Sequence, residues 1–322
     1  MNLLHYYIGV DLGGTKIRVA LARSGGEIVD VRSFPTEAER GTETVLANLQ
    51  SGVDVLLADG GCPWDKVAGM GVCVAGFYDC KAELMIKSPN LPGWEFFQLK
   101  QKLEDLFALP IVIENDASAA AYGEFCFGTG RGQEDMLLLT LGTGIGGGLV
   151  LGGKLYRGSR GFGGEIGHIP ILPDGPRCGC GRRGCLEALA SGTAIAREGR
   201  NLLAGHGTTL LREMVAVSGD LRAEHVFEAA RLGDAASNGI IDRAAYYLGR
   251  ALAIAVAILN PGIVVLSGGI AANGEQFFDP VRRHFHAAVL PLLATEMLIA
   301  GGRLGADSGI RGILQLVEEQ LE

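Results

Sequence analysis

The sequence predicts an α/β protein that consists of a duplicated unit with a cleft between the two copies. Two segments start alike, with an apolar strand, a glycine-threonine turn and a second apolar strand. They occupy residues 8–22, with the turn DLGGTK, and residues 136–151, with the turn LGTGIGGG. Such self-similarity indicates a duplicated supersecondary unit, and strands that alternate with helices are typical of α/β domains.

The individual elements follow from apolar runs and helical periodicity. In the first half, strands are predicted at residues 8–12, 17–22, 27–33, 67–75 and 111–114, and helices at residues 42–58, 100–108 and 117–127. In the second half, strands are predicted at residues 136–141, 149–151 and 263–266, with a cysteine-rich loop, helices to residue 259 and terminal helices. The repeat places a domain boundary near Asp116. We expect a small N-terminal domain at residues 1–116, a large domain at residues 117–305, and a C-terminal helix near residues 306–322 that can pack back on the small domain.

Composition and charge exclude several classes of protein. Hydrophobic residues make up 48% of the chain and charged residues 20%, the balance of a globular protein rather than a disordered one. The formal net charge of −8 argues against a nucleic-acid partner, which would require a basic surface for the phosphates. The 50 glycines are about twice the usual share and gather in short loops, where they let the backbone approach a ligand closely.

Neither a signal peptide nor a membrane span is predicted. The N-terminal residues lack a basic region followed by a small-residue cleavage site. Residues 251–273 carry no charge, but Asn260, Pro261 and Gly262 interrupt them, so neither part reaches the roughly 20 residues that a bilayer requires. We therefore expect a cytoplasmic protein with no membrane partner.

The first glycine turn is suited to binding phosphate. It contains Asp11, Gly13, Gly14, Thr15 and Lys16. Its glycines expose backbone N–H groups, its threonine adds a hydroxyl and its lysine adds a positive charge. The aspartate would repel a phosphate group unless a cation lies between them, so the turn implies Mg²⁺. An ordinary glycine hairpin is the alternative, although a tight hairpin requires fewer glycines.

The second glycine turn, residues 142–147, contains the letters of the dinucleotide-binding motif G-x-G-x-x-G. That motif must follow a strand and open a helix, whereas residues 148–153 are predicted to form a returning strand. The chain also lacks the G-x-x-x-x-G-K-[ST] pattern of a P-loop. Two phosphate-binding turns on opposite domains fit a cleft that holds a nucleotide from both sides.

One histidine and three cysteines form the most specific local pattern. His168 is followed by Cys178, Cys180 and Cys185, with intervening glycines that permit tight turns. A closed set of three thiolates and one imidazole is typical of a structural zinc site, and clustered cysteines favour metal binding over disulfides in a reducing compartment. The large domain should therefore carry a zinc-binding loop at residues 168–185. Three unrelated buried thiols are the alternative.

An acidic residue lies where a strand is predicted to end and a helix to begin. Asp116 could cap that helix, or it could face the cleft at the carboxyl end of the strand, where ligands collect. A kinase that phosphorylates a sugar alcohol needs such a base beside the attacking hydroxyl. Asn90, Glu165 and Glu187 offer amide and carboxylate groups that bind sugar hydroxyls, although each alone could be a solvated loop residue.

Together these motifs resemble the ROK family (repressors, open reading frames and kinases), and within it the bacterial glucokinases most closely. The resemblance rests on DLGGTK, NLPGW, ENDASAAAYGE, LGTGIGGG, GEIGH, CGCGRRGCLEALASG and LSGGIAAN, which occur in family order. It implies a duplicated actin-like, ribonuclease-H-like ATPase fold of two domains that close over ATP and sugar. It also implies ATP-dependent phosphorylation of a hexose at the 6-hydroxyl, with glucose as the first candidate, and a homodimer or homotetramer.

The resemblance also assigns roles to individual residues. Asp116 would take the proton from the 6-hydroxyl. The residues that would line the sugar are Gly76, Asn90, Asn115, Asp116, Glu165, His168 and Glu187. Those that would hold ATP and Mg²⁺ are Asp11, Gly13, Gly14, Thr15, Lys16, Gly142, Thr143, Gly144, Gly268 and Gly269. The ligands of the structural zinc ion would be His168, Cys178, Cys180 and Cys185.

Three alternatives remain open from the sequence. A related kinase for N-acetylmannosamine, N-acetylglucosamine, fructose or allose would share the phosphate-binding turns. A non-catalytic sugar-sensing regulator would need a DNA-binding segment, which we do not expect because the first turn begins at residue 11. An NAD-dependent oxidoreductase would need a helix after the G-x-G-x-x-G letters.

Overall fold

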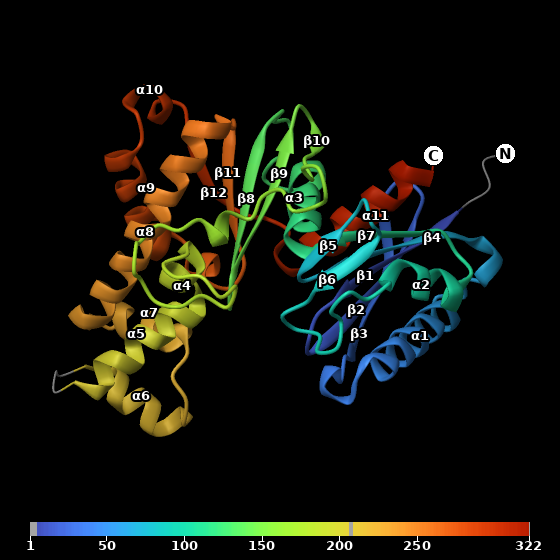
Figure 1. The fold of residues 1–322 in the computed structure, drawn as a ribbon, viewed down its shortest axis with the longest axis horizontal. Helices are drawn as coiled ribbons and strands as arrows, with labels where there is room; N and C mark the ends of the chain where they lie inside the picture. Colours follow the sequence, from blue (N-terminus) through green and yellow to red (C-terminus); the bar gives the residue numbers. More distant parts are fainter. Residues whose placement is uncertain (1–4, 206–208, 322) are drawn as a thin grey trace.

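The computed structural model describes residues 5–205 and 209–321 of the chain. Within this part, two five-stranded sheets form the framework (Figure 1). The first sheet has the order β3-β2-β1-β4-β7, with β1 at Tyr6–Leu12, β2 at Lys16–Arg23, β3 at Glu27–Pro35, β4 at Val67–Val74 and β7 at Ile111–Asn115. The second has the order β10-β9-β8-β11-β12, with β8 at Met136–Leu141, β9 at Ile145–Leu151, β10 at Lys154–Leu155, β11 at Ile263–Ser267 and β12 at Leu298–Gly301. A separate hairpin pairs β5 (Phe77–Asp79) with β6 (Leu84–Lys87).

The two sheets have the same topology. In each, a central strand pairs antiparallel with the next strand along the chain, β1 with β2 and β8 with β9. On its other side it pairs parallel with a later strand, β1 with β4 and β8 with β11. A further parallel strand, β7 or β12, completes each sheet. This common order confirms the predicted duplication and places the two glycine turns at equivalent positions, between β1 and β2 and between β8 and β9.

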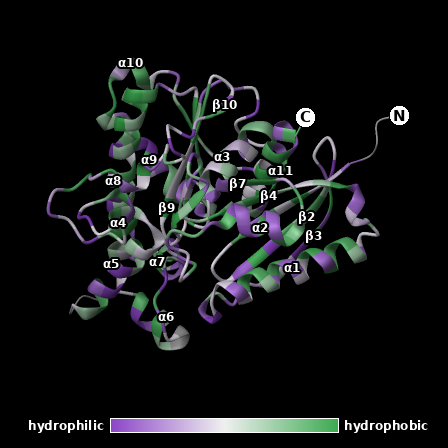
Figure 2. Cartoon of the chain, turned by 45° about the vertical axis from the view of Figure 1, so that its right-hand side comes forward, coloured by the Kyte–Doolittle hydropathy of each residue, from purple (hydrophilic) through white to green (hydrophobic). Residues whose placement is uncertain are grey.

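Helices pack on both faces of each sheet. The first sheet is covered on one face by α1 (Thr42–Asp59) and α2 (Leu99–Phe107), and with them forms the first lobe. The second sheet and its helices form the second lobe; these helices are α4 (Leu186–Ala190), α5 (Gly192–Ala204), α6 (Leu211–Ser218), α7 (Ala223–Arg231), α8 (Ala235–Leu259), α9 (Glu275–Ala288) and α10 (Pro291–Ala294). Along α1, Val45, Leu49, Val53 and Leu56 are buried at helical spacing. Figure 2 shows hydrophobic and hydrophilic residues alternating along this helix.

Two helices, α3 (Asp116–Phe127) and α11 (Ser308–Leu321), lie between the sheets (Figure 1). Alternate residues of the strands point to opposite faces, so Tyr7 and Leu138 join the core around α3 and α11 while Ile8 and Leu137 belong to the outer cores. The two helices cross at glycines. A Cβ atom at Gly312 would lie 1.8 Å from the carbonyl oxygen of Ala119.

Some elements differ from the sequence-based expectation. The strand expected at residues 149–151 begins at Ile145, because the glycines that were assigned to the turn are part of β9. They are required there by the close approach of α3, since a Cβ atom at Gly148 would lie 2.5 Å from the Ala121 Cβ. The hairpin β5-β6 and the edge strand β12 were not predicted. Both are short, and their sequences lack the regular alternation that identifies longer strands.

The domain bounds at residues 1–116 and 117–305 remain predictions. The C-terminal helix α11 lies against the first sheet, where a Cβ atom at Gly9 would be 2.7 Å from Leu314 Cγ. The uncharged residues 251–273 are divided between the end of α8 and β11. None of the helices in the described part of the chain is long and apolar enough to cross a membrane.

The helix crossing gives a first prediction. Gly312→Ala should destabilise the protein by about 1–3 kcal/mol, because the added methyl group must push α11 away from α3. Gly239→Ala is the matched control: Gly239 is exposed in α8, and a Cβ atom there would meet no other atom within 4 Å, so this change should be neutral or stabilising by about 1 kcal/mol. Thermal unfolding followed by circular dichroism compares the variants, and an equal response of both would contradict the close crossing.

Candidate active site

A cavity of about 530 Å³ lies where the carboxyl ends of the central strands meet the cysteine-rich loop. Most residues that the sequence analysis assigned to ligand binding line this cavity. They are Gly76, Asn90, Asn115, Asp116, Gly142, Thr143, Gly144, Glu165, His168, Glu187 and Gly268. They come from both lobes, so the structure brings together segments that are far apart in the chain.

The remaining predicted nucleotide-binding residues do not line the cavity. These are Asp11, Gly13, Gly14, Thr15, Lys16 and Gly269. The first glycine turn nevertheless adjoins it, because a Cβ atom at Gly14 would lie 2.7 Å from the carbonyl oxygen of the lining residue Asn90. Gly268 has a positive φ of 90° and packs against the backbone of Leu141, which borders the second turn.

The junction between β7 and α3 presents a carboxylate to the cavity. Asn115, not Asp116, is the N-cap of α3: its Oδ1 accepts hydrogen bonds from Ala117 N at 2.9 Å and Ser118 N at 3.1 Å. The alternative in which Asp116 serves as the helix cap is therefore wrong. Asp116 is the first helical residue, and its Oδ1 accepts a hydrogen bond from Ala117 N at 2.9 Å. The capped helix start fixes the backbone of Asp116 at the cavity wall.

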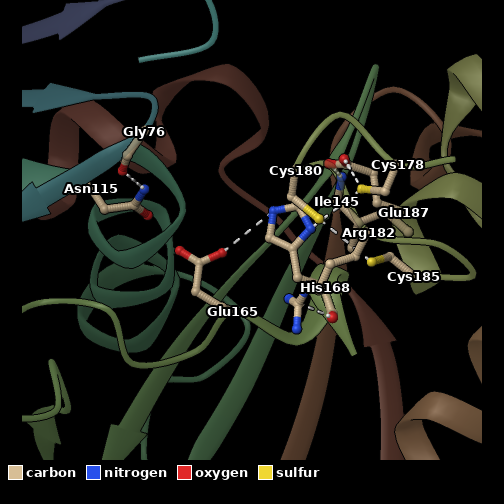
Figure 3. Close-up of polar contacts among 10 residues, drawn as sticks. All are labelled: Gly76, Asn115, Ile145, Glu165, His168, Cys178, Cys180, Arg182, Cys185 and Glu187. Carbon is tan, nitrogen blue, oxygen red and sulfur yellow. Dashed lines mark hydrogen bonds and ion pairs between the residues drawn. The ribbon is translucent and has the colours of Figure 1, made fainter. Parts of the chain in front are cut away.

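Asn115 also connects the junction to the loop after β4. Its Nδ2 donates a hydrogen bond to Gly76 O at 3.1 Å (Figure 3). Gly76 has a φ of 123°, and a Cβ atom there would lie 2.4 Å from Lys87 O, so only glycine fits. An amide nitrogen carries two hydrogens. Burial raises the pKa of Asp116, and a hydrogen bond from the Asn115 side chain is among the contacts that lower it, so this amide also lies against the Asp116 carboxylate.

Two half-buried carboxyl groups, those of Asp11 and Asp116, lie near each other at this end of the first sheet. Burial raises the pKa of Asp116 above its ordinary value. Burial, and then the charge of Asp116, raise the pKa of Asp11 to about 6. Mutual repulsion of two carboxylates creates a position that favours a divalent cation. Asp11 and its surroundings therefore fit the Mg²⁺ that the sequence implies, with oxygen as the donor atom that this ion prefers.

The four predicted zinc ligands converge in the cysteine-rich loop (Figure 3). The side-chain nitrogen and sulfur atoms of His168, Cys178, Cys180 and Cys185 all lie within 4.8 Å of one another. His168 Nδ1 is 3.6 Å from Cys178 Sγ, and Cys180 Sγ is 3.7 Å from Cys185 Sγ. Tetrahedral zinc with ordinary Zn–S and Zn–N bonds places two sulfur atoms about 3.8 Å apart and nitrogen and sulfur about 3.6 Å apart. The donor set and its spacing fit zinc.

The orientation of His168 links this cluster to the cavity. Its Nδ1 faces the sulfur atoms, while its Nε2 lies 3.9 Å from Glu165 Oε2 (Figure 3). With Nδ1 on the metal, Nε2 must carry the hydrogen and can donate it toward the cavity. Glu187 lies on the other side, where its Oε2 accepts a hydrogen bond from Ile145 N at 3.0 Å. That bond ties the zinc loop to the second glycine turn.

Sequence reasoning missed several lining residues. Arg177, Thr193 and Arg197 also border the cavity. Thr193 Oγ1 donates a hydrogen bond to Thr143 O at 2.8 Å, which attaches α5 to the second turn. Thr193 and Arg197 are four residues apart and so share one face of the helix. That spacing was visible in the sequence, but nothing showed that this face of α5 borders the cavity.

Comparison with known proteins identifies the family. The profile described as "ROK family" matches residues 7–320. The chain belongs to the ROK family. It is 39% identical over 316 residues to a glucokinase of Halalkalibacterium halodurans, covering 98% of this chain and 96% of the relative. It is 37% identical over 314 residues to a glucokinase of Thermotoga maritima, covering 98% of both. An N-acetylmannosamine kinase of Escherichia fergusonii is 35% identical over 309 residues, covering 93% of this chain and 96% of the relative.

Solved structures of the family have the same fold. A ROK family glucokinase from Streptomyces griseus, in complex with glucose and AMPPNP, superposes with a TM-score of 0.81 at 33% identity, covering 97% of this chain and 98% of that one. A ROK hexokinase from Thermus thermophilus gives the same TM-score and identity, covering 98% and 99%. The predicted duplicated actin-like ATPase fold of two domains is thereby confirmed.

The metal cluster gives a second prediction. The purified ROK protein should contain close to one zinc ion per chain, and Cys180→Ser should lose it, because three ligands remain where zinc requires four. Cys62→Ser, in the first lobe, is the control and should keep its zinc. Elemental analysis by mass spectrometry measures the content. Wild-type protein without zinc, or a Cys180→Ser variant that retains it, would contradict the assignment.

Proposed function

We propose that this chain is a sugar kinase that transfers the γ-phosphate of ATP to the 6-hydroxyl of a hexose, with glucose as the physiological sugar. The observation that carries the proposal is the position of Asp116. Its carboxylate borders a cavity that also presents the amide of Asn115 and the carboxylates of Glu165 and Glu187. Such groups recognise hydroxyls from several directions, and the same cavity is bounded by a phosphate-binding glycine turn.

In this mechanism the sugar lies between Asp116 and the zinc loop. The Nε2 hydrogen of His168 donates to a sugar oxygen, the amide group of Asn115 borders the sugar beside Asp116, and Glu165 and Glu187 accept from sugar hydroxyls. Asn90 and Gly76 complete the wall of this subsite. Asp116 accepts the proton of the 6-hydroxyl as that oxygen attacks phosphorus. Burial raises the pKa of Asp116, which makes its carboxylate a stronger base than an exposed aspartate.

The nucleotide lies between the two glycine turns. Backbone N–H groups of the two turns, together with the Lys16 ammonium group, bind the phosphate oxygens. The N–H groups of Gly13 and Gly142 instead donate to Lys16 O and Gly144 O and close the turns. Gly268 and Gly269 border the adenosine. Gly268 lets the chain pack against the backbone of Leu141, and a Cβ atom at Gly269 would meet nothing within 4 Å, so room remains at the end of β11. Asp11 would hold Mg²⁺, which would supply positive charge to neutralise the phosphate oxygens. His168, Cys178, Cys180 and Cys185 would hold zinc, which would stabilise the loop next to Glu187 and supply no chemistry to the transfer.

The relatives support a glucose kinase and leave a kinase for N-acetylmannosamine as the alternative. Two bacterial glucokinases are 39% and 37% identical to the chain. An N-acetylmannosamine kinase at 35% identity shows that the family includes a second sugar class at almost the same similarity. We further propose that the enzyme acts in the cytoplasm as a homodimer or homotetramer without a nucleic-acid partner.

Removal of the base gives the third prediction. Asp116→Asn should lower kcat by about 10²–10⁴-fold, because the amide cannot accept the hydroxyl proton, while glucose still binds. Asp135→Asn is the control. Asp135 lies just before β8 and does not line the cavity, and its Oδ1 accepts a hydrogen bond from Gly152 N in an exposed turn. Initial rates are measured by coupled ADP release, and glucose binding by calorimetry. Near-normal turnover of Asp116→Asn would refute the role of this residue.

A sugar panel tests the substrate and is the fourth prediction. Purified enzyme with ATP and Mg²⁺ should release ADP with glucose at a kcat/KM at least about tenfold above that with N-acetylmannosamine, N-acetylglucosamine, fructose or allose, a ratio that one pocket contact can produce. A higher kcat/KM for any other sugar would replace glucose as the substrate. The absence of ADP release with every sugar would refute the kinase assignment and favour a sugar-binding regulator.

A further inference from the structure

A glycine-rich loop of the second lobe reaches across to the first lobe. It covers residues 156–165, which connect β10 to the segment that contains Glu165 and His168. Gly158, Gly161 and Gly164 all have positive φ values, so the sequence itself gives this loop little stiffness. A Cβ atom at Gly161 would lie 2.6 Å from the carbonyl oxygen of Tyr78, which shows that the loop runs directly against the first lobe.

Two arginines anchor this loop to buried carboxylates of the first lobe. Arg157 Nε donates to Glu114 Oε2 at 2.6 Å, and the Glu114 side chain is only 5% exposed. Arg160 Nε donates to Asp79 Oδ2 at 2.7 Å, and the Asp79 side chain is only 1% exposed. The two carboxylates differ in their other hydrogen-bond partners. The other carboxylate oxygen of Asp79 bonds two N–H groups of its own turn, at residues 81 and 82.

Glu114 lies next to the reacting groups. It belongs to β7, immediately before Asn115 and Asp116, and its Oε1 accepts a hydrogen bond from Asn115 N at 3.0 Å. Its two oxygens therefore connect Arg157 of the glycine-rich loop to the backbone of the strand that ends at the base. Burial raises the pKa of Glu114 and the charge of Arg157 lowers it, so the arginine favours the ionised carboxylate.

A buried ion pair contributes little net stability, because desolvation of the two charges offsets their attraction. Stability alone therefore gives a weak reason for a charged pair at this position. A pair that joins two lobes has another effect: it fixes the distance between groups on either side. Here one side carries Asp116 and the other carries Glu165, and both border the same cavity.

We propose that Arg157 and Glu114 are positioning residues that hold the sugar-binding carboxylate of Glu165 at a fixed distance from Asp116, and so determine the affinity for sugar. This inference rests on the proposed kinase function. Arg157 and Glu114 do not line the cavity, so they would act on the sugar only through other residues. Arg157 acts on the position of Glu165 through the glycine-rich loop, and Glu114 acts on the position of Asp116 through the end of β7.

The decisive variant, and the fifth prediction, is Arg157→Gln. It should raise the KM for glucose by about ten- to a hundredfold, the loss expected when binding groups are displaced by a fraction of an ångström to one ångström. The KM for ATP should change less than about twofold, because the glycine turns are untouched. Arg157→Lys, which keeps the charge, should recover part of the glucose affinity. The double variant Glu114→Gln, Arg157→Gln should lose less glucose affinity than the two single variants lose in total, since it leaves no buried charge unpaired.

Arg160→Gln is the matched control from the same loop. It removes an ion pair to the same lobe, but Asp79 keeps its two backbone partners and lies farther along the chain from the base, so the glucose KM should rise by less than about threefold. Circular dichroism and thermal unfolding confirm that each variant is folded. Equal losses in the Arg157 and Arg160 variants, an unchanged glucose KM in Arg157→Gln, or parallel changes in the KM for glucose and for ATP would overturn the proposal.

The same assays distinguish this inference from the proposed function. If the wild-type enzyme phosphorylates glucose and Arg157→Gln has the same KM for glucose, only the positioning role is refuted. Wild-type enzyme that releases no ADP with any sugar refutes the kinase assignment, and the positioning role is then refuted with it.

Discussion

The packing of helix α3 against glycines on two sides is the constraint on which the site depends. On one side it crosses α11 at Gly123 and Gly312; on the other it lies against the glycines of β9, where a Cβ atom at Gly146 would be 2.8 Å from the Ala117 Cβ. Since α3 begins at Asp116, this packing fixes the carboxylate relative to the second glycine turn. A helix that starts in one lobe and is buried against the other thus holds Asp116 and the second glycine turn at a fixed distance from each other.

The residues that could be predicted were those whose chemistry is local. The cysteine spacing predicted which four side chains converge in the metal-binding cluster, because a closed donor set depends on neighbours along the chain. The glycine turns were recognisable for the same reason. Strand order was partly predictable, since the repeat implied two equivalent sheets. The assignment of residues 146–148 to a turn failed because their glycines serve a contact with α3 that is distant in sequence, and local patterns carry no information about such contacts.

The cavity is lined both by residues that the sequence identified and by residues that it did not. Asp116, Glu165 and Glu187 were found because their motifs resemble those of the ROK family, whereas Arg197 borders the same cavity without a motif of its own. The ion pair between Glu114 and Arg157 joins residues 43 positions apart and was beyond any spacing rule. Pairs of this kind become visible only when the fold places two lobes side by side, since each partner alone resembles an ordinary charged residue.

The predicted zinc site and the ion pair of Arg157 with Glu114 lie at opposite ends of the segment that contains Glu165. The four predicted zinc ligands lie at one end, beginning at His168, and the ion pair of Arg157 with Glu114 lies at the other, so Glu165 lies between two anchored points. Glycines at positions 161, 163 and 164 allow the chain to bend between these points, which a bulkier sequence could not do. A carboxylate held in this way depends on both anchors. In the proposed kinase, a zinc site remote from the phosphoryl transfer would still be required for it, because it would determine where the sugar lies relative to Asp116.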